Sequence, residues 1–66
     1  MKITLNGKEH KLAHPMTVEA LLGSLALKVG QVAIERNRTI VPRSTYGQEM
    51  LNEGDEIEVV HFIGGG

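Results

Sequence analysis

Apolar and polar residues alternate over residues 1–5, which predicts a half-buried β-strand at the start of the chain. Asn6-Gly7 follows, and this pair is typical of a two-residue hairpin turn because both positions tolerate a positive φ. Residues 8–12 are then expected to return as a second strand. This strand has few apolar residues and several charges, so we place it at the edge of a sheet.

The next apolar residues recur at helical spacing. Val18, Leu21, Leu22 and Leu25 stand at i, i+3, i+4 and i+7, which gives one apolar stripe. Thr17 precedes the first of them and is expected to be the N-cap. The helix should end within residues 25–27. A helix this short is not stable alone in water, so it is expected to lie on a sheet.

Two short strands and a turn are predicted after the helix. The first strand covers residues 31–35, and the second covers residues 39–41 and is stopped by a proline. Residues 36–38 form the turn between them, where Asn37 can take the left-handed conformation.

The last third of the chain is expected to close the core and then form the final strand. Ser44 is expected to cap a single helical turn over residues 45–48, and Met50 and Leu51 to fill the bottom of the core. A turn at residues 52–55 then leads into a strand over residues 56–62, which is apolar enough for a central position.

This order of elements predicts an α+β fold. If the last strand lies beside the first, the two are parallel and the helix lies in the crossover between them. That arrangement is a β-grasp, with a mixed sheet of four to five strands and one main covering helix. At 66 residues, the chain is expected to be a single ubiquitin-like domain over 1–66 with a flexible glycine tail over 64–66.

Composition narrows the functional classes. The chain has no cysteine, so neither disulfides nor cysteine-ligated metals hold it together, and a cytoplasmic location is expected. The formal net charge is −1, which argues against a nucleic-acid partner. No apolar run approaches the roughly 20 residues of a membrane span, so we expect no membrane partner.

The usual catalytic residues are in poor positions for catalysis. Ser24 and Ser44 lie outside any Gly-x-Ser-x-Gly motif and fit local roles in helices. His10 and His14 are four residues apart, but the following proline removes the helical face that such a metal site needs. His61 lies on the last strand, where it either helps a partner to bind or simply lines the exit of the chain.

Acidic residues gather toward the C-terminal end, in contrast with the basic residues earlier in the chain. They are Glu49, Glu53, Asp55, Glu56 and Glu58. Two interpretations stay open: the charges only keep the protein soluble, or they steer it toward a basic partner surface.

The last strand suggests a contact surface. If Ile57 and Val59 face the core, Val60 and Phe62 point away from it, because strand side chains alternate. A valine and a phenylalanine on the outer face of so small a domain are typical of a partner-binding site. The alternative is that a bulge or an edge buries them.

The chain ends Ile63-Gly64-Gly65-Gly66. Glycine has no Cβ and accepts any backbone angle, so this segment can thread its carboxylate into a narrow active site. Extended, it reaches roughly 13 Å. The carboxylate of Gly66 is then the candidate reactive group, able to attack the α-phosphate of ATP and form an acyl adenylate. The alternative is an inert terminus or a remnant of cloning.

With these residues in view, the whole chain resembles the sulfur carrier family of thiamine biosynthesis, a ubiquitin-like β-grasp family. The resemblance covers Ile3-Thr4-Leu5-Asn6-Gly7, Thr17-Val18-Glu19-Ala20-Leu21-Leu22, Ile40-Val41-Pro42-Arg43-Ser44, the stretch 51–60 and the terminal Gly65-Gly66. The chain departs from the family pattern in two places. The turn at 36–38 lacks the usual Asn-Gly, and Gly64 adds a third glycine to the end.

The resemblance implies a protein co-substrate rather than an enzyme. An E1-like adenylyltransferase would use ATP and Mg to adenylate Gly66, with Gly64 and Gly65 threaded into its active site. A cysteine desulfurase relay would supply the sulfur of a thiocarboxylate, and thiazole synthase would receive it. Val60, Phe62 and Ile63 would bind the partners, and the chain itself would hold no cofactor and no metal.

Three other functions remain open from the sequence. The chain could be a sulfur carrier for molybdopterin synthesis or tRNA thiolation, with the same chemistry at the tail. It could be a ubiquitin-like modifier joined to lysines, or a β-grasp interaction module whose glycines are inert.

Overall fold

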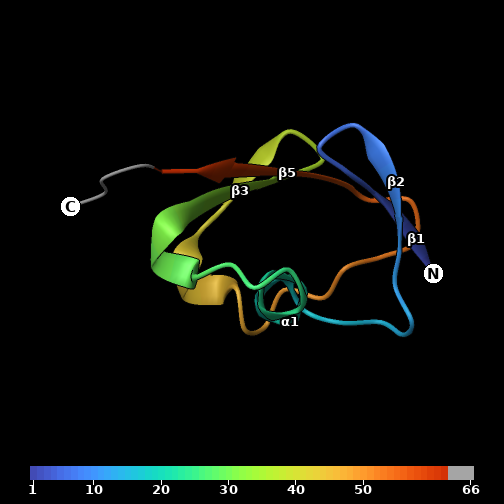
Figure 1. The fold of residues 1–66 in the computed structure, drawn as a ribbon, viewed down its shortest axis with the longest axis horizontal. Helices are drawn as coiled ribbons and strands as arrows, with labels where there is room; N and C mark the ends of the chain where they lie inside the picture. The colour runs from blue at the N-terminus through green and yellow to red at the C-terminus, as the bar shows by residue number, and fades with distance from the viewer. Residues whose placement is uncertain (63–66) are drawn as a thin grey trace.

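The computed structural model describes residues 1–62 and contains a mixed five-stranded sheet covered on one side by a helix (Figure 1). Its elements are β1 (Lys2–Leu5), β2 (Lys8–Lys11), α1 (Val18–Ser24), the 3₁₀ turn η1 (Val29–Gln31), β3 (Val32–Arg36), β4 (Thr39–Val41), the 3₁₀ turn η2 (Arg43–Thr45) and β5 (Glu56–His61). The strand order is β2-β1-β5-β3-β4, with β5 parallel to β1 and the other pairs antiparallel. The β-grasp expectation is confirmed.

The first hairpin positions the central strand. Asn6 and Gly7 both have positive φ, 50° and 81°, as the turn requires. The Asn6 N–H donates to the Ile57 carbonyl (2.9 Å), and the Asn6 side-chain oxygen accepts from the Val59 N–H (2.8 Å). The turn residue therefore ends the pairing of β1 with β5 and holds β5 in register.

Helix α1 begins as expected and ends slightly early. The Thr17 hydroxyl oxygen accepts a hydrogen bond from the Ala20 N–H (3.1 Å), which caps the first turn. The helix ends at Ser24 because Ala26 takes the left-handed conformation (φ 58°). In this Schellman arrangement the Leu27 N–H donates to the Leu22 carbonyl (2.9 Å) and the Ala26 N–H to the Gly23 carbonyl (3.0 Å).

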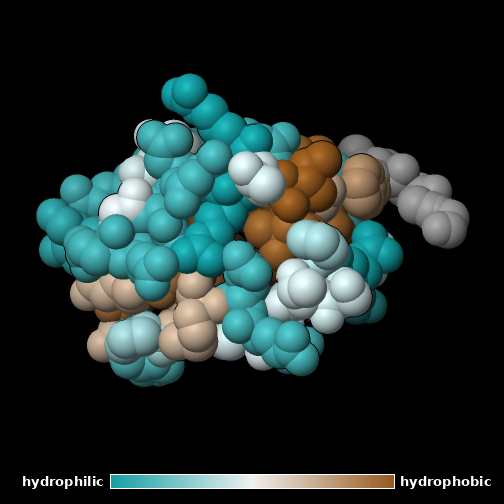
Figure 2. All heavy atoms as spheres, turned by 180° about the vertical axis from the view of Figure 1, so that it is seen from behind, coloured by the Kyte–Doolittle hydropathy of each residue, from teal (hydrophilic) through white to brown (hydrophobic). Residues whose placement is uncertain are grey.

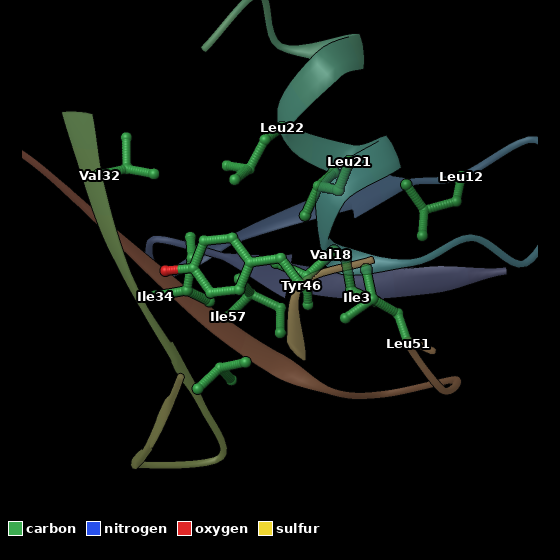
Figure 3. Close-up of a cluster of buried hydrophobic side chains, with 11 residues drawn as sticks. Ile3, Leu12, Val18, Leu21, Leu22, Val32, Ile34, Tyr46, Leu51 and Ile57 are labelled. Atoms are coloured by element: carbon green, nitrogen blue, oxygen red, sulfur yellow. The ribbon is translucent and has the colours of Figure 1, made fainter. Parts of the chain in front are cut away.

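The core fills the space between α1 and the sheet (Figure 3). Val18, Leu21 and Leu22 from α1 are completely buried and face Ile34 and Ile57 from the sheet. The other buried apolar residues are Ile3, Leu12, Val32, Val41, Tyr46 and Leu51. Leu25, the last residue of the predicted stripe, packs against this cluster while partly exposed.

The single turn expected over 45–48 is present, because the Gln48 and Glu49 N–H groups both donate to the Thr45 carbonyl (2.9 Å each). The Ser44 cap is wrong: Ser44 lies inside a preceding 3₁₀ turn, η2 (Arg43–Thr45), which begins after Pro42 with no side-chain cap. Tyr46, which follows η2, lies in the core at 3% exposure, a burial that the sequence did not predict.

Met50 does not fill the core. Its side chain is 47% exposed, whereas Leu51 is 1% exposed. Met50 forms an isolated antiparallel bridge with Thr17. Neighbouring residues in extended backbone point to opposite sides, so burial of Leu51 turns Met50 outward.

The second hairpin is tighter than expected. Strand β3 starts and ends one residue later than the predicted 31–35, and Arg36 pairs with Thr39. The turn is therefore only Asn37-Arg38, with φ of 51° and 68°. These angles suit a type I′ turn, which matches the twist of antiparallel strands. The final strand ends at His61, one residue before the predicted limit.

A group of charged residues anchors this turn to the start of β5. Arg36 pairs with Asp55 (Nε–Oδ2, 2.9 Å) and with Glu49 (Nη1–Oε2, 2.7 Å). The buried Asp55 carboxylate also accepts from the Asn37 side-chain amide (3.1 Å) and the Asn52 backbone N–H (2.8 Å). Both carboxylate oxygens of Asp55 therefore accept hydrogen bonds, which offsets the free-energy cost of burying the charge.

Asp55→Ala is expected to destabilise the domain by about 1–3 kcal/mol, because it leaves the Asn52 N–H and part of the Arg36 guanidinium without acceptors. Urea denaturation measures this change. Glu53→Ala is the matched control, since Glu53 is exposed and accepts one hydrogen bond, from the Lys2 N–H (3.1 Å). Equal stability of Asp55→Ala and the natural chain would contradict the proposed anchoring.

Candidate functional site: the outer face and end of β5

Strand β5 lies at the centre of the sheet and is the last strand of the described chain (Figure 1). His61 pairs with Val32 of β3, and the Phe62 N–H donates to the Gln31 carbonyl (2.8 Å). Backbone pairing therefore holds the chain as far as Phe62. Ile63, Gly64, Gly65 and Gly66, which the sequence analysis assigned to partner contact, threading and reaction, lie outside the described residues.

The two sides of β5 differ as the alternation predicts. Ile57 is 1% exposed and Val59 packs against the core. Val60 and Phe62 are 50% and 45% exposed on the side of the sheet away from α1. Neither a bulge nor the sheet edge buries them, and their role in partner binding stays a prediction.

Ile40 is a further exposed apolar residue that the sequence did not lead us to expect. It lies on β4, opposite Glu35 of β3, and its side chain is 72% exposed. Ala33, which pairs with Val60, lies on β3, the strand between β4 and β5. Its neighbour Val41 is buried, so strand alternation applied to residues 39–41 was the available signal.

We call Ala33, Val60 and Phe62 the apolar half of the outer face; Ile40 lies beside it, in the same cross-strand row as Glu35 and Glu58. Figure 2 shows an apolar area at the end of the molecule where β5 finishes, with hydrophilic atoms toward the opposite end of the sheet. Exposed apolar groups that gather in this way mark interaction sites in soluble domains. The apolar half lies at the C-terminal end of β5.

The acidic cluster of the sequence divides into separate groups in the structure. Asp55 and Glu49 pair with Arg36, and Glu53 accepts from the Lys2 N–H. Only Glu56 and Glu58 remain on the outer face. They lie on β5, where Glu35 of β3 stands directly opposite Glu58.

The histidines and serines do not form a second site. His14 lies 3.0 Å from the Pro15 carbonyl through Nδ1, and the Ser24 hydroxyl donates to the Leu21 carbonyl (2.7 Å). Within residues 1–62, no three histidine, aspartate or glutamate side chains gather as metal ligands would. No helix of this part of the chain is long and apolar enough to cross a membrane.

The fold, with its exposed apolar surface beside the outgoing central strand, defines a ubiquitin-like β-grasp domain. Comparison with known proteins gives the family. The model of the ThiS family matches residues 3–66, and the chain therefore belongs to the ThiS family.

Individual relatives agree with this assignment. The chain is 40% identical to the sulfur carrier protein ThiS of Bacillus subtilis, over 97% of this chain and 98% of that protein. A crystal structure of the thiamine biosynthesis protein ThiS from Geobacter metallireducens superposes with a TM-score of 0.85 at 30% identity, covering both chains completely.

A second group of relatives is much longer. The chain is 53% identical over its whole length to part of a thiazole synthase from Paramagnetospirillum magneticum. It spans only 20% of the length of that protein. The chain is also 53% identical to part of the thiazole synthase of Magnetococcus marinus, and it again spans 20% of the length of that protein.

Proposed function

We propose that this protein is a sulfur carrier of thiamine biosynthesis whose Gly66 carboxylate becomes a thiocarboxylate. The observation that carries the proposal is the match to a sulfur carrier protein over nearly the full length of both chains. The central position of β5 supports it, because backbone pairing in the sheet holds the chain in place up to Phe62, four residues before Gly66. The carrier acts in the cytoplasm, where ATP is available for its activation.

The carrier supplies the terminal carboxylate and the surface that positions it. A carboxylate is ionised and weakly nucleophilic at neutral pH. An E1-like adenylyltransferase with ATP and Mg activates it: a Gly66 oxygen attacks the α-phosphate and pyrophosphate leaves. A persulfide from a cysteine desulfurase relay then displaces AMP, and cleavage of the sulfur–sulfur bond by another thiol leaves the thiocarboxylate. Gly64 and Gly65 give the slender segment that reaches the active site.

Thiazole synthase is the proposed acceptor of the sulfur. Relatives named thiazole synthase contain a segment 53% identical to this entire chain, which supports a functional link between the two. A carrier for molybdopterin synthesis or tRNA thiolation, and a ubiquitin-like modifier, share the tail chemistry. No specific observation favours either one over thiazole formation.

A sulfur-transfer assay tests the acceptor. The thiocarboxylated carrier, labelled with ³⁵S, is incubated with thiazole synthase and its small-molecule substrates, and in parallel with tRNA-thiolating and molybdopterin-forming enzymes. We expect labelled thiazole phosphate from the first mixture alone. Label in tRNA or molybdopterin, with none in the thiazole, would contradict the proposal.

Phe62→Ala is expected to weaken partner binding by roughly tenfold, because an exposed aromatic at the centre of a contact can contribute more than 1 kcal/mol. The free energy of unfolding should change by less than about 1 kcal/mol. Calorimetry with the adenylyltransferase and urea denaturation measure the two effects.

Met50→Ala is the matched control for Phe62→Ala. Its side chain is exposed to a similar extent, 47% against 45%, but it lies beside Thr17 at the start of α1. We expect normal binding from this control. A large loss of stability with unchanged binding in Phe62→Ala would show that Phe62 belongs to the core.

A further inference from the structure

We propose that the outer face of the sheet fixes the direction in which the carrier docks, because its acidic half receives a lysine or arginine of the partner. The acidic half consists of Glu35, Glu56 and Glu58. The proposal rests on the proposed function, since the partner is the sulfur acceptor, of the thiazole synthase class. The docking proposal specifies the partner surface: an apolar area faces Val60 and Phe62, and a basic side chain faces the acidic half.

The arrangement of Glu35 and Glu58 is unfavourable for the isolated domain. The two residues stand directly opposite each other on antiparallel strands and point to the same face. Like charges in that position destabilise a sheet. Glu56 is two residues from Glu58 and faces the same way, opposite Thr4 of β1. An approaching cation would relieve this repulsion.

A hollow in the surface adjoins these carboxylates. Its volume is about 310 Å³, and it lies between the β1–β2 turn at Gly7 and the β3–β4 turn at Arg38. Glu35, Glu56 and Glu58 line it. Its lining thus carries three carboxylates against the single guanidinium of Arg38.

These carboxylates are not engaged elsewhere in the described chain. The ion pairs found within residues 1–62 are Lys2–Glu9, Arg36–Glu49 and Arg36–Asp55. None of them includes Glu35, Glu56, Glu58 or Arg38. The hollow therefore favours a cationic side chain from outside, with Arg38 limiting how many positive charges it accepts.

The acidic half lies toward the start of β5 and the apolar half toward its end. Glu56 begins the strand, Glu58 precedes Val60 by two residues on the same face, and Phe62 follows the strand. At about 3.3 Å per residue, the two ends are roughly 17 Å apart. An apolar patch alone could dock in several orientations. A basic side chain at the acidic half selects the one that directs the tail into the partner's active site.

The test uses the full chain with thiazole synthase as the probe. In the Glu35→Gln, Glu58→Gln double variant, we expect the dissociation constant to rise roughly tenfold at low salt, from loss of electrostatic attraction. The dependence of binding on salt should become weaker. The melting temperature should rise, because the repulsion between the two residues is gone. A residue with only a structural role would change the melting temperature without changing the salt dependence of binding.

Glu19→Gln is the control for loss of a carboxylate away from the docking face, with half the change of charge of the double variant, because it lies on α1, which covers the other side of the sheet. We expect its binding to equal that of the natural chain. Unchanged binding of the double variant at every salt concentration would overturn the docking proposal while leaving the sulfur-carrier function standing. Absence of both binding and sulfur transfer in the natural chain would instead overturn the proposed function, and the docking proposal with it.

Discussion

A variant with one alanine appended after Gly66 is expected to lose adenylation completely while keeping the fold. The added residue moves the carboxylate by about 3.5 Å and places a methyl group in a passage proposed to accept only glycine. Even a 1 Å displacement of a reacting group can cost a hundredfold in rate. Pyrophosphate release by the E1-like adenylyltransferase measures the loss, and circular dichroism measures the fold.

Gly23→Ala is the control for the added methyl group. Gly23 lies in α1, and a Cβ built there has no neighbour within 4 Å. Alanine favours a helix more than glycine by roughly 1 kcal/mol, so this variant should be more stable and fully adenylated. Normal adenylation of the extended chain would show that the Gly66 carboxylate is not the reactive group.

Leu22→Ala is expected to lower the free energy of unfolding by about 2–5 kcal/mol. The side chain of Leu22 points from α1 toward the sheet and is completely buried, so its truncation leaves a cavity in the core (Figure 3). A domain of this size has little stability to lose, so the variant should be partly unfolded at physiological temperature. Urea denaturation followed by circular dichroism measures the change.

Ile40→Ala removes a side chain of similar size from the outer face, where Ile40 is 72% exposed. Its effect on stability should stay within about 0.5 kcal/mol. Comparable losses in Leu22→Ala and Ile40→Ala would contradict the assignment of the buried and exposed faces.

The parts of the fold that follow from local patterns were predictable from the sequence. Alternation identified β1 and β5, helical spacing identified α1 with its Thr17 cap, and Asn6-Gly7 identified the first turn. In each case a side-chain period or a backbone requirement acts over a few residues. These local preferences agree with the final structure, which is typical of small natural domains.

The stretch between β4 and β5 has no such period. Tertiary contacts decide there that Tyr46 is buried and Met50 is exposed. The α1 N-terminus shows the reason: the Glu19 N–H donates to the Tyr46 carbonyl (3.0 Å) and the Val18 N–H to the Glu49 carbonyl (2.9 Å). A local sequence pattern does not predict such hydrogen bonds between distant segments.

The candidate site was predictable only along its own strand. Alternation in β5 placed Val60 and Phe62 on the outer face. The contributions of Ile40 and Glu35 depend on the register of β4 and β5 against β3, which a single sequence does not specify. The acidic residues 49–58 looked like one cluster because they are close in the chain. The turn before β5 directs Asp55 inward to Arg36 and leaves Glu56 outside.

Intact mass spectrometry of the protein purified from cells that make their own thiamine tests the sulfur-carrier function most directly. We predict a species heavier by the replacement of one oxygen by sulfur, with the change located in the C-terminal peptide. The species should disappear when Gly66 is deleted. A terminus that stays an ordinary carboxylate while the cells require thiamine synthesis, or that is joined to lysines of other proteins, would contradict it.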